Sequence, residues 1–250
     1  MARRGSRYDA RVAWYREWFG EEYLELYAHR DAGEAGRHVD FVERTLEPRR
    51  PRRVLDLACG AGRHSAALAQ RDHEVCGVDL SLTLLGKVAT PGRVRADMRR
   101  LPFAAGAFDW VLNFFTSFGY FETEGENFEV LEEIARVLAP GGSFLIDLMN
   151  VDYALAHLKE RETFEVEGRR VEIERRYEAV SRRMQKRIRV VERNGPARIF
   201  VESVRAYRRD EVEEGLRWAG LVVTRVHGGF DGAPFDRTSE RLILIGRRQA

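Results

Sequence analysis

Short apolar runs and a helical pattern alternate in the middle of the chain. The run at residues 54–57 predicts a buried strand, and a glycine turn at 60–62 separates it from a helical pattern at 63–70. A second strand is expected at 75–78 and leads directly to Asp79. This order of strand, turn, helix and strand predicts a βαβ unit with a carboxylate at the tip of its second strand.

The same periodicities continue toward the C-terminus and predict a larger α/β domain. The elements expected after the βαβ unit are, in chain order, strands at 93–96 and 108–115, a helix at 124–138 that ends before Pro140, a strand at 143–148, a helix at 209–219, and strands at 221–227 and 241–246.

The N-terminal segment is predicted to be helical and is rich in aromatic residues. Residues 8–46 are expected to form two or three helices, with a break around Gly33 and Gly36. Two interpretations stay open for the aromatic part. It could cap a ligand, with Tyr23 or Tyr27 in contact with that ligand, or it could be a helix packed on the edge of the sheet.

Residues 161–209 have a different character from the rest of the chain. Alternating apolar and polar positions, with a turn at Asn194-Gly195, predict antiparallel strands joined by hairpins. The segment holds 15 Arg or Lys residues against 8 Asp or Glu residues. This excess would suit an anionic substrate or RNA. Because the acidic residues are interleaved and aromatic residues are few, a solvated lid face or a dimer edge is favoured.

Composition argues against several classes of protein but does not indicate a function. The 250 residues are 44% hydrophobic and carry a net charge of +2, which gives no reason to expect binding to nucleic acid. Cys59 and Cys76 lack the spacing of a zinc site, so reduced thiols are expected. No apolar run reaches the roughly 18 residues of a membrane span. We expect a soluble, cytoplasmic protein without membrane contact, as a monomer or homodimer.

The βαβ unit has the chemistry of a nucleoside site. Glycines allow a ligand to approach the backbone closely, and a carboxylate at the next strand tip can accept both hydroxyls of a ribose. Dinucleotides and S-adenosylmethionine are both bound in this way. The dinucleotide fingerprint requires a third small residue close to the helix, where this chain has Ser65. Instead, Asp56 stands four residues before Gly60.

At this point five segments resemble, in order and in spacing, the motifs of class I S-adenosylmethionine-dependent methyltransferases. They are DLACGAGRH, GVDLS, ADMRRLPF, FDWVLNFFTSFGYF and LAPGGSFLIDLMN, within residues 53–150. The bacterial small-molecule branch is the most similar, since it also has an aromatic N-terminal helix and a C-terminal strand like SERLILIGRR. The resemblance implies a Rossmann-like, doubly wound α/β fold with a mostly parallel seven-stranded sheet whose last strand is antiparallel.

The resemblance implies S-adenosylmethionine as cofactor and methyl transfer to a nucleophilic atom of a small molecule by in-line displacement. It divides the chain into an N-terminal helical cap (1–47), a cofactor-binding domain (48–160 and 210–250) and an antiparallel lid (161–209). No metal is expected, because Asn113 stands where metal-dependent members have a carboxylate. The alternatives are an RNA- or protein-modifying methyltransferase that uses the arginine-rich insertion, a non-catalytic adenosine-ligand-binding protein, and an NAD enzyme.

Eleven residues are expected to bind the cofactor. Asp79 would accept hydrogen bonds from the ribose. The resemblance places Asp97 on the adenine amino group, with the alternative that Asp97 caps its own loop, and Asp56 could orient the glycine turn from behind. The full set is Tyr27, Asp56, Ala58, Gly60, Gly62, Asp79, Leu80, Asp97, Met98, Asn113 and Phe114.

The acceptor end of the site is less well defined by sequence. Tyr120, Asn150 and His227 are the candidate substrate residues, although Asn150 would also serve as the cap of the helix that follows it. Tyr120 or His227 could remove a proton, but no catalytic residue is assigned. Arg63 and His64 open a helix and are expected to be solvated.

Overall fold

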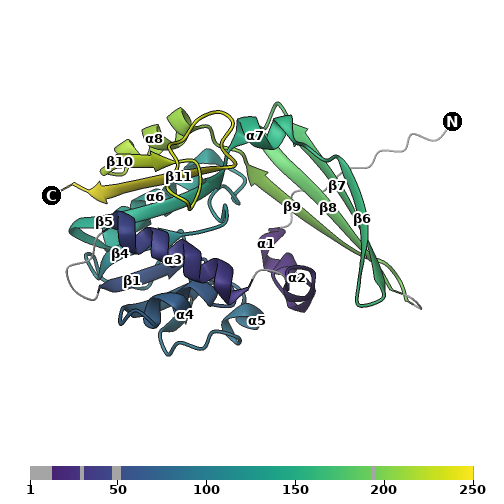
Figure 1. The fold of residues 1–250 in the computed structure, drawn as a ribbon, viewed down its shortest axis with the longest axis horizontal. Helices are drawn as coiled ribbons and strands as arrows, with labels where there is room; N and C mark the ends of the chain where they lie inside the picture. The colour runs from purple at the N-terminus through teal and green to yellow at the C-terminus, as the bar shows by residue number, and fades with distance from the viewer. Residues whose placement is uncertain (1–12, 29–30, 47–51, 193–194, 250) are drawn as a thin grey trace.

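The computed structural model describes residues 13–28, 31–46, 52–192 and 195–249, which form two sheets with helices around them (Figure 1). The larger sheet has the order β10-β11-β5-β4-β1-β2-β3. Its strands are β1 (Arg53–Leu57), β2 (Glu74–Asp79), β3 (Arg93–Arg95), β4 (Phe108–Asn113), β5 (Leu138–Met149), β10 (Leu221–His227) and β11 (Arg241–Arg248).

Strand direction in the larger sheet follows the expected pattern. β1 to β5 run parallel to one another, whereas β11 is antiparallel to both of its neighbours, β5 and β10. In the centre of the sheet, Leu55 lies opposite Cys76 on one side and Val111 on the other. The predicted Rossmann-like fold class, with its antiparallel last strand, is confirmed.

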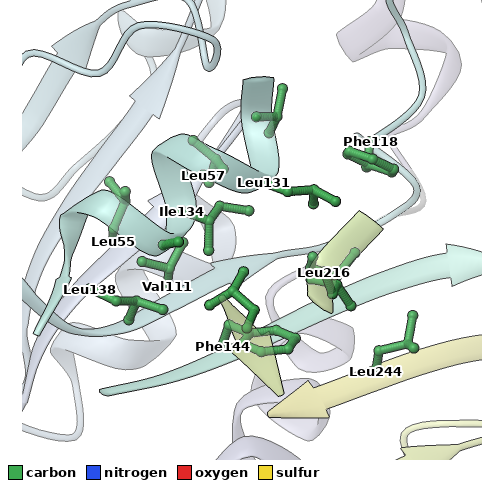
Figure 2. Close-up of a cluster of buried hydrophobic side chains, with 14 of the residues drawn as sticks. Leu55, Leu57, Val111, Phe118, Leu131, Ile134, Leu138, Phe144, Leu216 and Leu244 are labelled. Carbon is green, nitrogen blue, oxygen red and sulfur yellow. The ribbon is translucent and has the colours of Figure 1, made fainter. Parts of the chain in front are cut away.

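Alternation along the strands gives the sheet two buried faces. Leu55 and Val111 point to one face, which α6 (Glu124–Val137) and α8 (Arg209–Trp218) cover (Figure 2). Val54 points to the other face, which α3 (Ala32–Leu46) and α4 (Arg63–Ala69) cover. The short helix α5 (Leu82–Leu85) follows β2. Both clusters hold large apolar side chains without exposed surface, so the sheet is a rigid base for the loops at its strand ends.

The expected helix break around Gly33 and Gly36 is wrong. Both glycines lie inside α3. The side chain of Asp31 accepts a hydrogen bond of 2.8 Å from the backbone N–H of Glu34, as an N-cap residue does. A glycine within a helix costs only about 1 kcal/mol relative to alanine, so the cap and the apolar face of α3 outweigh both glycines.

Two strand boundaries also differ from the sequence-based expectation. β4 ends at Asn113 rather than at residue 115, because Phe115 and Thr116 have φ angles of 58° and 56°, outside the extended region. β5 begins at Leu138, five residues earlier than expected, and continues through Pro140-Gly141-Gly142. A register shift between Phe108 and Trp110 on β4 accommodates this irregular stretch.

The smaller sheet is the insertion after β5 and the helix α7 (Val151–Ala156). Its strands are antiparallel in chain order: β6 (Arg161–Val166), β7 (Arg169–Glu178), β8 (Arg183–Val191) and β9 (Arg198–Arg205). One face packs on α1 (Tyr15–Trp18) and α2 (Glu21–Leu26), which lie between the two sheets (Figure 1). The expected Asn194-Gly195 turn falls partly outside the described residues, because Asn194 is not among them.

The arginines of the smaller sheet have acidic partners across and along the strands. The ion pairs include Arg175 with Glu162 at 2.8 Å and Arg189 with Glu172 at 2.8 Å. The guanidinium of Arg169 pairs with Glu25 of α2 at 2.5 Å. The positive charge of the insertion is therefore distributed among carboxylates rather than gathered into one basic surface.

A buried ion pair joins β5 to β11. The carboxylate of Asp147 has no exposed surface and accepts hydrogen bonds from Arg241 Nε at 2.7 Å and from the backbone N–H of Phe115 at 2.8 Å. The same guanidinium donates to Thr116 Oγ1 at 3.2 Å. Burial raises the pKa of Asp147, while the guanidinium opposes that shift. The pair holds the two residues with positive φ in place.

We expect the substitution Arg241→Ala to lower the free energy of unfolding by about 3–5 kcal/mol, because it leaves a buried carboxylate without its counter-charge. Urea denaturation followed by circular dichroism measures this change. Arg247→Ala, at an exposed position of the same strand, is the matched control and should change stability by less than about 0.5 kcal/mol. Equal effects of the two substitutions would contradict a structural role for the ion pair.

Candidate functional site

A cavity lies at the carboxyl ends of β1, β2, β3 and β4, where open α/β sheets bind ligands. Loops that follow these strands form its floor, and α1 and α2 form its opposite wall. Its empty space, counted out to the open mouth, is about 1170 Å³.

The loop between β1 and α4 is held in a tight, left-handed path. Ala58, Gly60 and Gly62 have φ angles of 60°, 56° and 78°. The N–H of Gly62 donates to the carbonyl of Cys59 at 3.0 Å. A Cβ atom at Gly62 would lie 2.8 Å from Val88 Cγ1, so both conformation and space require glycine there. The loop presents the backbone of Ala58 and Gly60 to the cavity.

Asp79 is a largely buried carboxylate at the tip of β2. One oxygen accepts from the backbone N–H of Gly60 and the other from that of Ser81, each at 2.8 Å. Burial raises the pKa of Asp79 above the usual 3.8, and these N–H donors oppose that shift. Because each carboxylate oxygen can accept more than one hydrogen bond, Asp79 keeps acceptor capacity on the cavity side.

Asp56 lies deeper than Asp79, below the glycine turn. It is 1% exposed and accepts a 2.6 Å hydrogen bond from the hydroxyl of Ser65, the first-turn residue of α4. Burial raises the pKa of Asp56 to about 6, with a smaller contribution from the Asp79 charge. The side chain therefore anchors α4 to β1 from behind the turn and also borders the cavity floor.

The loop after β3 brings Asp97 and Met98 to the cavity. The Asp97 carboxylate accepts from Arg99 Nε at 3.0 Å, from Arg99 Nη2 at 2.7 Å and from the Arg99 backbone N–H at 3.0 Å. These bonds hold the pKa of Asp97 below its usual value, although burial opposes them. Asp97 thus caps its own loop and borders the cavity at the same time.

Aromatic rings from both ends of the fold enclose the rest of the cavity. Tyr120, in the loop after β4, stacks on Phe19 with ring centroids 5.8 Å apart and contacts Trp14 at 4.8 Å. Burial raises the pKa of Tyr120, which disfavours the phenolate form that would be needed to remove a proton. The rings that line the cavity are Tyr15, Phe19, Tyr23, Tyr27, Phe114, Phe115, Tyr120 and Phe121.

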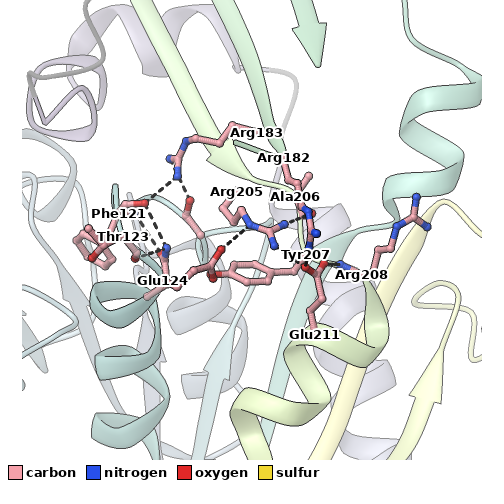
Figure 3. Close-up of polar contacts among 12 residues, drawn as sticks. Phe121, Thr123, Glu124, Arg182, Arg183, Arg205, Ala206, Tyr207, Arg208 and Glu211 are labelled. Carbon is pink, nitrogen blue, oxygen red and sulfur yellow. Dashed lines mark hydrogen bonds and ion pairs between the residues drawn. The ribbon is translucent and has the colours of Figure 1, made fainter. Parts of the chain in front are cut away.

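The N-terminal aromatic segment is therefore not a helix on the edge of the larger sheet. α1 and α2 line the cavity on one side and pack on the smaller sheet on the other. Arg183 of β8 reaches the same region, where its guanidinium donates to the carbonyls of Phe121 at 2.8 Å and Tyr120 at 3.1 Å (Figure 3). The smaller sheet thus fixes both the helical wall and the loop of Tyr120.

Nine of the eleven predicted cofactor residues border the cavity: Tyr27, Asp56, Ala58, Gly60, Asp79, Leu80, Asp97, Met98 and Phe114. The other two, Gly62 and Asn113, do not line it. Gly62 packs closely against Val88 in the turn that precedes α4. Asn113 is 2% exposed within the sheet, where its Nδ2 donates to the carbonyl of Leu57 at 2.9 Å.

Among the candidate substrate residues, only Tyr120 borders the cavity. Asn150 caps α7, and its Nδ2 donates to the carbonyl of Ser239 at 2.7 Å. His227 contacts the ring of Phe41 edge-on, and its Nδ1 lies 3.0 Å from the carbonyl of Gly232. Asn150 and His227 do not line the main cavity, and both side chains bond to the β10–β11 connection instead.

Arg63 and His64 border the cavity, although the sequence favoured solvated positions. His64 is 4% exposed and stacks on Phe114 with centroids 4.1 Å apart. Arg63 pairs with Glu34 and lies 4.4 Å above the ring of Phe115. The partners of both side chains come from distant segments, so the local pattern at the start of α4 carried no signal for their burial.

A second cavity lies next to the first and opens to the surface. Phe115 borders both cavities and separates them. The second cavity is lined by Glu34, His38, Phe115, Gly228, Gly229, Phe230, Asp231, Ala233, Ser239, Glu240 and Arg241.

Two further observations concern the described part of the chain. No group of three or more His, Cys, Asp and Glu side chains is placed there to hold a metal ion. None of its helices combines the length and the apolar character needed to cross a bilayer.

Comparison with known proteins agrees with this geometry. Residues 54–142 match the family model of the methyltransferase domain. The chain is 30% identical over 207 residues to the cypemycin N-terminal methyltransferase of a Streptomyces species, which covers 79% of this chain and 84% of that protein. It is 33% identical over 137 residues to the putative methyltransferase YqeM of Bacillus subtilis, about half of each chain (52% and 53%).

Solved structures share the fold over nearly the whole length. The CcbJ methyltransferase of Streptomyces caelestis has a TM-score of 0.78 at 21% identity, over 93% of this chain and 98% of that one. CalS10, an amino pentose methyltransferase from Micromonospora echinaspora whose structure has S-adenosylmethionine bound, has a TM-score of 0.68 at 24% identity, over 92% and 97%. Its motifs, its fold and the relative that it matches over 84% of that protein's length agree, and this chain belongs to the class I S-adenosylmethionine-dependent methyltransferases.

Proposed function

We propose that the main cavity binds S-adenosylmethionine and that the protein transfers its methyl group to a small-molecule amine. The observation that carries the cofactor assignment is Asp79, a partly buried carboxylate at the tip of β2 with acceptor capacity left on the cavity side. A ribose diol satisfies such a carboxylate with two hydrogen bonds.

The neighbouring residues fit the remaining parts of the cofactor. Asp97 and Met98, one strand further along the sheet, would hold the adenine through a carboxylate and an adaptable apolar wall. The backbone of Ala58 and Gly60 would meet the amino-acid arm on the opposite side of Asp79. Three adjacent strand ends thus offer one surface for each part of the molecule.

The cofactor, when bound, supplies a methyl group already activated by a positive sulfonium. The residues of the chain then have to orient the acceptor, exclude water and tolerate the positive charge. The aromatic rings that line the cavity meet the last two requirements, because ring faces attract cations and displace water. Phe114 and Tyr120 lie just after β4, at the edge of the sheet where the reacting atoms would meet.

An amine acceptor is supported by the character of the cavity and by the names of similar proteins. The cavity beyond the cofactor residues is aromatic, a lining that suits a cationic or basic nitrogen. Relatives include a cypemycin N-terminal methyltransferase and a glycine/sarcosine N-methyltransferase of Halorhodospira halochloris. A solved neighbour is the sugar N-methyltransferase KedS8.

We expect Asp79→Asn to weaken the binding of S-adenosylhomocysteine, the demethylated product, by about 30-fold or more, equivalent to about 2 kcal/mol. The substitution keeps the shape of the side chain but removes its charge and one acceptor oxygen. Isothermal titration calorimetry measures the affinity. Asp72→Asn, which removes the same charge at an exposed turn outside the cavity, should leave binding unchanged. A change of less than threefold for Asp79→Asn would reject the ribose assignment.

The affinity for S-adenosylhomocysteine should also depend on pH. Burial raises the pKa of Asp79 above 3.8, so the carboxylate begins to bind a proton at a higher pH than an exposed aspartate. Since the protonated form accepts fewer hydrogen bonds, affinity should be highest where Asp79 is ionised and should fall as the pH is lowered through its raised pKa, at a pH where an exposed aspartate is still ionised. Calorimetry across this range should show the fall in the wild type and in Asp56→Asn, and its loss in Asp79→Asn. A pH-independent wild type would contradict the model.

Transfer of a labelled methyl group tests the acceptor class. Protein and S-adenosylmethionine with a labelled methyl group are incubated with glycine, a dipeptide and an amino sugar, and separately with a phenol and with transfer RNA. We expect label in the amine samples only. The arginines of the smaller sheet are largely paired with carboxylates, so transfer RNA should gain no label at low or high salt. Label in the RNA or the phenol would replace the amine proposal.

A further inference from the structure

His38 and His64 form a buried pair that the methyltransferase motifs do not account for. His38 Nδ1 and His64 Nε2 are 3.1 Å apart, and the two side chains are 8% and 4% exposed. The rings come from α3 and from the first turn of α4, 26 positions apart in sequence. A hydrogen bond between two neutral imidazoles couples their tautomers: either His64 Nε2–H donates to His38 Nδ1, or His38 Nδ1–H donates to His64 Nε2.

The two rings border different cavities. His64 lines the main cavity and His38 lines the second one. Each ring uses one nitrogen in the shared hydrogen bond. The remaining nitrogens, Nδ1 of His64 and Nε2 of His38, have no hydrogen-bond partner among the residues that the structure describes. A polar atom that a fold leaves unpaired beside a ligand cavity is available to that ligand.

Aromatic neighbours hold both rings in fixed orientations. His64 stacks on Phe114 with an interplanar angle of 11°, and His38 stacks on Phe230 at a centroid distance of 3.8 Å. The ring centroid of Phe115 lies 5.4 Å from that of His38 and 5.7 Å from that of His64. Because Phe114 and Phe115 follow β4 directly, the free nitrogen of His64 belongs to the part of the cavity where the acceptor would meet the methyl group.

Burial, with a smaller contribution from nearby arginines, favours the neutral form of both rings. Burial, together with Arg63, Arg37 and Arg241, lowers the pKa of His38 to about 4, and Glu34 opposes that shift only in part. Burial and Arg63 likewise lower the pKa of His64. A neutral imidazole has one bare nitrogen that accepts a hydrogen bond, and it adds no positive charge beside a sulfonium.

We propose that His64 Nδ1 accepts a hydrogen bond from the N–H of the acceptor amine and so directs the nitrogen lone pair at the methyl group. His38 is the positioning residue: its Nδ1 accepts the Nε2–H of His64, which keeps Nδ1 of His64 unprotonated, and its own Nε2–H faces the second cavity. No proton moves in this step. The assignment rests on the proposed function for the acceptor but concerns a residue that the cofactor does not require.

The protonation of the pair can be measured without an acceptor. Histidine side-chain nitrogens are observed by long-range ¹H–¹⁵N correlation in the full-length protein saturated with S-adenosylhomocysteine. We expect His64 to be protonated at Nε2 and bare at Nδ1 between pH 6.5 and 8. A proton on Nδ1 of His64, or an imidazolium at this position, would overturn the proposal, because no lone pair would then face the cavity.

Matched substitutions test the function of each nitrogen. His64→Asn places a polar atom near the Nδ1 position, whereas His64→Gln places one near Nε2. We expect His64→Gln to lower kcat/KM for an amine that the wild type methylates by about tenfold or more, with a smaller loss for His64→Asn. Binding of S-adenosylhomocysteine should stay within about twofold in both variants. Equal kcat/KM in the wild type and His64→Gln, or loss of product binding in both variants, would contradict the assignment.

The second ring has its own matched pair. His38→Asn keeps an acceptor near the Nδ1 position, while His38→Phe keeps the stacking on Phe230 but removes the acceptor. The proposal requires His38→Phe to change the protonation of His64 in the spectrum and to lower kcat/KM more than His38→Asn does. Equal rates in the two variants would show a packing role only. If no amine is methylated by the wild type, the proposed function fails, and the spectrum still decides the state of the pair.

Discussion

The hydrogen bonds from Gly60 and Ser81 to Asp79 hold together the loops at the ends of two neighbouring strands. Without this carboxylate, the N–H groups of both loops would face each other across β1 and β2 with no acceptor between them. A charged group that the empty fold already uses for its own loops is pre-organised for a ligand, because binding requires no rearrangement of its position. Under the proposed function, cofactor recognition would therefore depend on an interaction that also stabilises the fold.

Both sheets contribute to the cavity, in different ways. The larger sheet supplies strand ends with polar groups, held by the two apolar clusters that cover its faces. The smaller sheet supplies no cavity residue of its own among those described, but it anchors α1 and α2 and, through Arg183, the loop of Tyr120. Under the proposed function, the strand ends of the larger sheet would recognise the cofactor, whereas α1, α2 and the loop of Tyr120 would enclose the acceptor.

The sequence predicted the features that depend on residues close together in the chain. The βαβ unit, the left-handed glycine turn and the position of Asp79 follow from apolar runs and residue types that are close together in the chain. The burial of His64 did not follow, since its partner His38 is 26 positions away. The partners of Asn113 and His227 did not follow either, because a side chain at a strand end can point to the cavity, into the sheet or toward a loop, and only the packed fold decides which.

Phe115 and Thr116 both adopt left-handed backbone conformations, which cost side-chain-bearing residues of order 1 kcal/mol or more each. Two hydrogen bonds offset this cost. Asp147 accepts one from the backbone N–H of Phe115, and Arg241 donates one to Thr116 Oγ1. Glycine at position 115 would relax the backbone, but it would also remove the ring that borders both cavities and contacts Arg63 and His64. The chain thus keeps a strained backbone conformation at the residue whose side chain lines two neighbouring cavities.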